Sequence, residues 1–216
     1  MAYIKLLKLT ASGPDNRIST IEFAKKATII AGPSDTGKTC IFKCIDYVLG
    51  ASNEAKHEPF DEADGYTTIN LLMDTVYGHI SLTREQGSNK TYVSCKNQEI
   101  ENGEYLLKAT KNNSKTINNL MLKILGLKED LIIPKSTDGK PAKFTWRTLK
   151  KAFFVDEKRA DQNESILLPA DRGGDTLYLA GLIYFLTNND LSTYLLRDEP
   201  KEIKEAKREW NGNPFH

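Results

Sequence analysis

The chain has 216 residues, of which 39% are hydrophobic and 27% are charged, and its formal net charge is +1 at pH 7. This length and composition fit a soluble globular protein of one domain, or one and a half, and argue against a disordered or fibrous chain. A net charge so close to zero gives no overall basic field, so any surface for nucleic acid must be local.

The cysteines and histidines give no sign of a disulfide or a zinc site. Cys40 and Cys44 lie one helical turn apart in a predicted helix, which suits small buried hydrophobic residues, and the three histidines are scattered. We therefore expect a reduced, cytoplasmic compartment. The N-terminus lacks signal-peptide architecture, and no apolar run reaches the ~20 residues that cross a membrane.

The first predicted elements are two strands, over 3–10 and 18–23, joined by a polar turn over 11–17. A short apolar and β-branched run over 27–31 follows and is typical of a buried strand. Immediately after it, residues 32–39 (Gly-Pro-Ser-Asp-Thr-Gly-Lys-Thr) form a complete G-x-x-x-x-G-K-[ST] motif.

A helix is predicted over 40–49, since apolar residues recur there at i, i+3, i+4 and i+7, and Gly50 is a helix stop. A phosphate-binding loop requires a strand before it and a helix after it. Because both are predicted here, we interpret the motif as a true phosphate-binding loop and not as a chance match. Two predicted strands precede the strand that leads into the loop. In a small kinase or GTPase the strand before the loop usually comes first, so this order of elements is different.

The residue types of this loop point to nucleoside triphosphate binding. Gly32 and Gly37 permit a backbone whose N–H groups face an anion at the positive end of the helix. Lys38 supplies a charge for the β- and γ-phosphates, and the Thr39 hydroxyl is placed to ligate Mg²⁺. We therefore predict ATP and Mg²⁺ as cofactors, with a catalytic role for Lys38. The predicted binding residues are Gly32, Pro33, Ser34, Asp35, Thr36, Gly37, Lys38, Thr39 and Cys40.

Beyond the helix, a polar loop over 51–65 leads into alternating strands over 66–73, 77–84 and 90–95, which predict an antiparallel meander. The run from Ile69 to Asp74 resembles a Walker B strand, whose closing Asp could bind magnesium. A hairpin is the stronger interpretation, because the alternation resumes beyond Asp74 and no Glu follows it.

A helix is predicted over 114–125, with Gly126 at its end. The segment over 135–159 then combines eight basic residues with interleaved aromatic residues. One interpretation is a surface that contacts the DNA backbone. The other, which the spacing of Leu149, Ala152 and Phe153 favours, is a solvated helix face with the aromatic residues in the core.

The last predicted elements are two helices of different character. The helix over 176–186 is apolar nearly all round and should be buried. The segment over 191–210 is strongly charged and predicts the start of an exposed helix or coiled coil, followed by an irregular end over 211–216. We accordingly expect one lobe over 1–190, followed by these two segments.

This order of elements, with the loop helix ending in Ile-Asp-Tyr-Val-Leu-Gly at 45–50, resembles the N-terminal half of an SMC/RecN-type ATPase head. Such heads belong to the ABC class of P-loop ATPases, which act in DNA repair, chromosome maintenance and phage defence. The resemblance is strong over 3–50 and loose over the rest, up to 210. It implies an α/β fold, in which a P-loop NTPase core is flanked by an antiparallel β-meander and ends in the start of a charged helix.

The resemblance also implies what this chain needs for catalysis. In the family, a long coiled coil follows, and a C-terminal half carries the signature loop and the Walker B strand. A glutamine after the meander helps to hold Mg²⁺ and the attacking water; Gln162 is the best match for this catalytic and metal-binding role, with a surface loop residue as an equal alternative. Since no LSGGQ-like signature is present, we expect ATP to be bound far better than it is hydrolysed.

The expected partner is therefore a C-terminal ATPase half or a second head subunit, in a homo- or hetero-oligomer, with DNA as a further candidate partner of 135–159. Two alternatives remain. In the first, the chain is an autonomous small P-loop kinase or GTPase, although it lacks an N-K-x-D guanine signature. In the second, it is a non-catalytic interaction module regulated by nucleotide.

Overall fold

The structure is a computed structural model that describes residues 2–34, 36–51, 65–111, 113–155, 175–189 and 191. The chain divides into two compact units, residues 1–128 and 129–216. The predicted loop over 51–65, Asp35, Gln162 and the segments predicted over 191–210 and 211–216 lie wholly or mostly outside the described residues. The single lobe expected over 1–190 stays a prediction.

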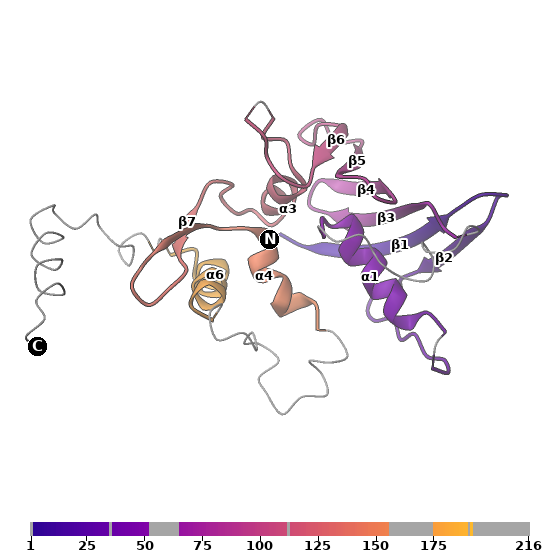
Figure 1. Cartoon of the computed structure of the whole chain (residues 1–216), viewed down its shortest axis with the longest axis horizontal. Helices are drawn as coiled ribbons and strands as arrows, with labels where there is room; N and C mark the ends of the chain where they lie inside the picture. Colours follow the sequence, from indigo (N-terminus) through magenta and orange to yellow (C-terminus); the bar gives the residue numbers. More distant parts are fainter. Residues whose placement is uncertain are drawn as a thin grey trace, which may run out of the picture. The chain divides into compact units, whose positions relative to one another are not determined.

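The first unit contains a six-stranded antiparallel sheet with the strand order β2-β1-β3-β4-β5-β6 (Figure 1). Its strands are β1 (Ile4–Ser12), β2 (Ile18–Glu22), β3 (Thr68–Thr75), β4 (Gly78–Glu85), β5 (Lys90–Cys95) and β6 (Gly103–Leu106). Leu9 of β1 stands opposite Ile21 of β2 on one side and Leu71 of β3 on the other. The predicted strand pair and meander are confirmed within one or two residues, and β6 is an additional strand.

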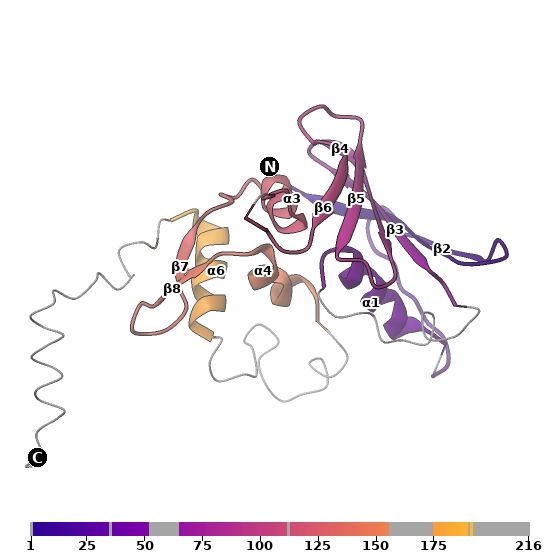
Figure 2. The ribbon, with the colours of Figure 1, turned by 45° about the horizontal axis from the view of Figure 1, so that its top comes forward.

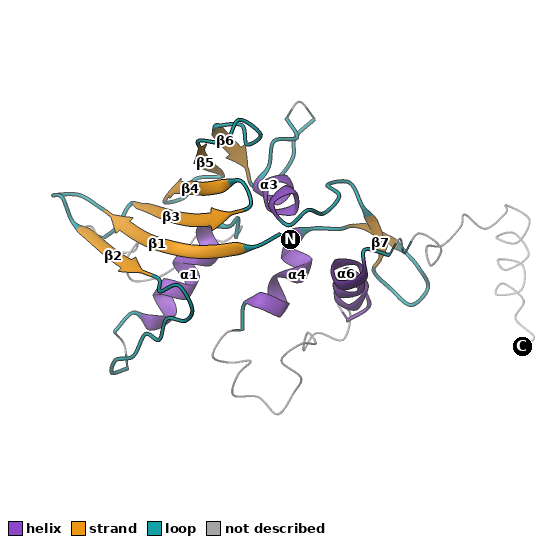
Figure 3. Ribbon diagram, turned by 180° about the vertical axis from the view of Figure 1, so that it is seen from behind, coloured by secondary structure: helices purple, strands orange, loops and turns teal. Residues whose placement is uncertain are grey.

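The two faces of this sheet differ in polarity because strand side chains alternate between them. One face carries the core, including Leu9, Leu71 and Leu82, and the helix α1 (Lys38–Val48) lies across it (Figures 2 and 3). On the opposite face, the side-chain amide of Asn70 donates to the hydroxyls of Ser81 at 2.8 Å and Thr83 at 2.7 Å. The P-loop helix therefore packs on the apolar face.

The helix α3 (Ile117–Ile124) completes the described part of the first unit, inside the range predicted for it. The Thr116 hydroxyl accepts from the backbone N–H of Asn119 at 3.1 Å, which is a standard N-terminal cap. At its start, Ile117 packs against Gly50, where an added Cβ would stand 3.3 Å from the Ile117 side chain.

The second unit contains a short hairpin of β7 (Ile132–Pro134) and β8 (Pro141–Lys143), and the helices α4 (Trp146–Phe153) and α6 (Asp175–Thr187). Phe144 and Tyr184 are both buried and meet edge to face, with 5.4 Å between ring centroids. The predicted helix over 176–186 is confirmed. Its burial is one-sided, however, because Leu179, Ile183 and Leu186 are exposed while Tyr178, Ala180, Gly181 and Tyr184 are buried.

One predicted element is wrong: residues 27–31 do not form a strand. Ile29 is 91% exposed and Ile30 is 40% exposed. A strand buries its backbone only when a neighbouring strand satisfies its N–H and C=O groups. Among the described strands, β2 and β6 form the sheet edges and neither pairs with this run. The antiparallel α/β fold is thus confirmed without the strand expected before the loop.

Candidate nucleotide-binding site

The second glycine of the motif makes the turn from loop to helix. Gly37 is the N-cap of α1 and has a φ of 82°, a left-handed conformation that other residues adopt only with strain. Its carbonyl accepts the first helical hydrogen bond, from the N–H of Ile41 at 3.2 Å. Within the described chain, no side chain caps this helix end and its first turn carries no acidic residue. The positive end of the helix dipole therefore faces the loop.

The ammonium group of Lys38 lies over the loop. Its Nζ donates to the carbonyl oxygen of Gly32 at 2.9 Å and to that of Pro33, and it lies 3.4 Å from the Thr36 hydroxyl. The Thr36 hydroxyl itself donates to the Pro33 carbonyl at 2.8 Å. These hydrogen bonds hold the positively charged Lys38 ammonium against the turn that begins at Gly32, the first glycine of the motif.

The donor set fits a nucleoside triphosphate with Mg²⁺. An ammonium and a helix N-terminus are the groups that bind phosphate oxygens. The hydroxyl of Thr39, an exposed residue in the first turn of α1, is an oxygen ligand of the kind that Mg²⁺ prefers. Ser34 lies in the exposed turn of the loop, while Asp35 lies outside the described residues.

An apolar cavity of about 230 Å³ opens beside the loop, between α1 and the strands β1 and β2. Its lining includes Thr36 and Gly37 of the loop, Cys40 and Cys44 of α1, and Tyr66. A hydrogen bond between the two thiols and, after it, burial raise the pKa of Cys44 well above its usual range. The expectation that both cysteines are small buried residues holds for Cys44, whereas Cys40 is partly exposed.

The far end of α1 is held by Arg84, a residue that the sequence analysis missed. Arg84 is buried, and its Nη1 donates to the carbonyls of Tyr47 and Ala51, the latter at 2.8 Å. Its Nε and Nη2 donate to the Ser88 carbonyl, which joins the helix end to the turn between β4 and β5. The available signal was positional: Arg84 follows Ile80 and Leu82 at every second residue, on the apolar face of β4.

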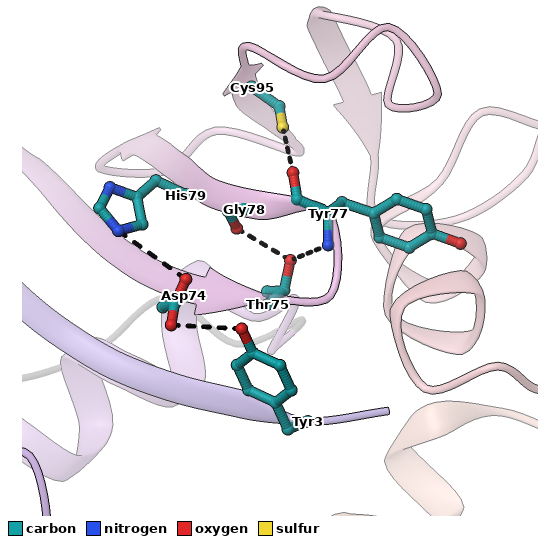
Figure 4. A network of polar contacts seen from close by, with 7 residues as sticks. All are labelled: Tyr3, Asp74, Thr75, Tyr77, Gly78, His79 and Cys95. Carbon is teal, nitrogen blue, oxygen red and sulfur yellow. Dashed lines mark hydrogen bonds and ion pairs between the residues drawn. The ribbon is translucent and has the colours of Figure 1, made fainter. Parts of the chain in front are cut away.

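Asp74 lies at the β3–β4 hairpin, opposite His79 (Figure 4). The Tyr3 hydroxyl donates to its Oδ2 at 3.4 Å, and the Nε2 atom of His79 lies 3.8 Å from its Oδ1. Loss of surrounding water, then the charge of Asp74 and this hydrogen bond, raise the pKa of Tyr3. The hairpin interpretation of this stretch is therefore confirmed, and Asp74 contacts Tyr3 and His79 at the hairpin.

The described part of the basic segment is an amphipathic helix with its neighbouring strands. Phe144, Trp146 and Leu149 are buried, as the structural interpretation of this segment requires, whereas Phe153, which that interpretation also placed in the core, is 54% exposed. Lys143 forms an ion pair with Asp130 at 2.8 Å. Lys158, Arg159 and Gln162 lie outside the described residues, so the DNA-contacting role and the role of Gln162 stay predictions.

A glycine turn at the start of a helix, a lysine over that turn and an adjacent threonine are the features of a P-loop nucleotide-binding protein. A family model described as an AAA domain matches residues 16–211. The chain therefore belongs to this AAA domain family and is a nucleotide-binding ATPase module. Family membership confirms, at the level of the ATPase class, the resemblance seen in the sequence.

Among solved structures, the chain is similar to one described as "Structural biochemistry of ATP-driven dimerization and DNA stimulated activation of SMC ATPases". The two are 18% identical with a TM-score of 0.31, and the match covers 42% of this chain and 70% of that chain. No curated protein matches the chain. Within the described residues, no helix is long and apolar enough to cross a membrane.

Proposed function

We propose that this chain is the ATP-binding half of an SMC/RecN-like ATPase head. The observation that carries the proposal is the position of the Lys38 ammonium, over the loop that Gly37 turns into the N-terminus of α1. In this proposal, residues 32–40 hold the phosphates, and Lys38 exchanges its carbonyl partners for β- and γ-phosphate oxygens. Hydrogen bonds between charged groups are stronger than those to neutral carbonyls, so the exchange favours binding.

Two residues are proposed to hold Mg²⁺, namely Thr39 and Gln162. Bound through the Thr39 hydroxyl, the ion would neutralise negative charge on the phosphates. Gln162 is the further candidate for holding Mg²⁺ and orienting the attacking water. Phosphoryl transfer depends on such positioning, so we expect weak hydrolysis from this chain alone.

The exposed apolar run before the loop supports the half-head proposal. Ile29 and Ile30 belong to a β-branched stretch that suits a buried strand, yet both side chains are exposed. We propose that a C-terminal ATPase half or a second head subunit, with the signature loop and the Walker B strand, supplies the missing neighbouring strand. Exposure of this run in the chain alone is what such an arrangement predicts.

We further propose, from the resemblance, a role in DNA repair, chromosome maintenance or phage defence. From the residues themselves we propose a cytoplasmic location, DNA bound along 135–159 and a coiled coil starting in 191–210. Binding of a partner subunit and binding of DNA are tested in separate experiments. A negative result in either experiment leaves the proposal of ATP binding unchanged.

The test of ATP binding compares two lysine variants by titration with ATP and Mg²⁺. We expect Lys38→Ala to abolish measurable ATP affinity and to keep the fold, because the loop lysine contributes little to the core. Lys26→Ala is the matched control, since Lys26 is an exposed lysine a few positions before the same loop in the sequence; this variant should bind ATP as the unmodified chain does. Retained affinity in Lys38→Ala would overturn the proposal.

A further inference from the structure

Two cysteine thiols face each other in the helix that follows the loop. The Sγ atoms of Cys40 and Cys44 are 3.8 Å apart, and both residues are thiols in this structure. Cys40 directly follows Thr39, so this pair spans the helical turn that continues the phosphate-binding loop. A chemical change at the pair therefore acts on the backbone next to the proposed ligands of the nucleotide.

A small oxidant has a route to these thiols. Cys40 is partly exposed, and both cysteines line the cavity of about 230 Å³ beside the loop. Leu9, Ile21 and Ile41 give this cavity an apolar wall. Such a wall admits a small uncharged molecule such as hydrogen peroxide more readily than a bulky, charged disulfide. Cys95, the third thiol, is buried and donates to the carbonyl of Tyr77 in another part of the sheet (Figure 4).

A disulfide between these residues does not fit a regular helix. Residues four apart in a helix have Cβ atoms about 5–6 Å apart, whereas a disulfide holds its Cβ atoms about 3.5–4.5 Å apart. Closing the bond therefore draws the turn between Cys40 and Cys44 together. Because Cys40 is joined to Thr39, this contraction shifts the loop end of α1 out of its regular geometry.

We propose that Cys40 and Cys44 are an oxidation site, at which a peroxide converts the two thiols to a disulfide within α1 and thereby weakens ATP binding by the loop. The oxidation rests on the 3.8 Å between the two sulfur atoms and on their access from the cavity. Its effect on ATP rests on the proposed function. By linkage, bound ATP should in turn disfavour the disulfide at equilibrium by the same factor.

The reaction balances with hydrogen peroxide as the only oxidant. The Cys40 sulfur attacks one peroxide oxygen, the O–O bond breaks, and the released hydroxide leaves as water with the thiol proton, which gives a sulfenic acid. The Cys44 sulfur then attacks the Cys40 sulfur, the S–O bond breaks, and hydroxide leaves as a second water with the Cys44 proton. Two thiols are oxidised to one disulfide, and one peroxide is reduced to two waters.

The first test treats the reduced 216-residue chain with hydrogen peroxide and maps its peptides by mass spectrometry. We expect a peptide in which Cys40 and Cys44 have together lost two hydrogen atoms, reversed by dithiothreitol, while Cys95 stays reduced. In Cys44→Ala, oxidation should stop at a sulfenic acid on Cys40 that dimedone traps. Oxidation of Cys95 at the same rate, or no linkage of Cys40 to Cys44, would overturn the inference.

The second test measures ATP affinity before and after oxidation. We expect about a tenfold loss, restored by dithiothreitol, because the strained turn weakens charge-assisted hydrogen bonds to phosphate. Cys44→Ala cannot form the disulfide, so peroxide should lower its ATP affinity less than it lowers that of the unmodified chain. An oxidised chain with unchanged affinity would overturn the regulatory half of the inference. If the reduced chain binds no ATP, the proposed function fails, while the peptide map still decides the oxidation site.

Discussion

The guanidinium of Arg84 on β4 lies over the ring of Tyr47 on α1, with 3.8 Å between the guanidinium carbon and the ring centroid. The same guanidinium donates to the Tyr47 carbonyl, at the end of the helix where the dipole is negative. The Tyr47 hydroxyl returns to the sheet, donating to the Glu85 carbonyl at 2.6 Å. Contacts at the C-terminal end of α1 thus set the position of a helix whose N-terminal end forms the loop.

Arg84→Met should destabilise the first unit by about 2–4 kcal/mol, because it leaves buried carbonyls that Arg84 satisfies without donors. Urea denaturation measures this change in the free energy of unfolding. Arg17→Met is the matched control: Arg17 is exposed, and its loss should change stability by less than about 0.5 kcal/mol. Equal effects of the two substitutions would contradict the anchoring role of Arg84.

Gly37→Ala should weaken ATP binding by straining the loop. Gly37 has a φ of 82°, and an alanine in this left-handed region costs about 1–2 kcal/mol. Gly126→Ala imposes the same kind of strain at a φ of 70°, and neither added Cβ would meet another atom within 4 Å. We expect both variants to lose stability to a similar degree and only Gly37→Ala to lose ATP affinity, as measured by titration. A matching loss of affinity in Gly126→Ala would show a general effect of stability.

The elements that the sequence predicts well are those whose signal is local. Alternation marks β3, β4 and β5 because each of these strands has one buried face, and the turn before β2 contains Asp15 and Asn16 with φ of 54° and 59°. The glycines of the loop and the 3.6-residue period of α1 are equally local. The turn at Gly37 and the helix that follows it could therefore be predicted from the sequence.

The elements that the sequence predicts poorly depend on distant partners. The run over 27–31 has the composition of a buried strand, but its burial requires a neighbouring strand that the described residues do not supply. The pairing of Arg84 with the end of α1 likewise joins positions 37 residues apart in the chain. Composition and spacing carry no information on such partners.

Ile29→Lys tests whether 27–31 belongs to the core of this chain. Because Ile29 is 91% exposed, the substitution should change the free energy of unfolding by less than about 0.5 kcal/mol. Leu71→Ala, at a fully buried position of β3, should cost about 2–5 kcal/mol in the same denaturation experiment. A comparable loss in Ile29→Lys would mean that the run is already buried without a partner.

Gly181→Ala should destabilise the second unit although alanine favours helices. An added Cβ would lie 2.9 Å from the Thr148 side chain and 3.0 Å from the Phe144 ring, so α6 and its neighbours must move apart. We expect a loss of about 1–3 kcal/mol in thermal or urea unfolding. Adding Thr148→Ala removes one of the two clashes and should recover part of the loss; no recovery would place the cost elsewhere.

The most direct test of the central claim is calorimetric titration of the unmodified chain with ATP and Mg²⁺, with phosphate release measured on the same sample. The account predicts saturable binding at one site and negligible turnover, as expected of a half-head that lacks its completing partner. No saturable binding would contradict the nucleotide-binding site built on Lys38. Robust turnover by the chain alone would contradict the half-head, since it would require a complete active site within these 216 residues.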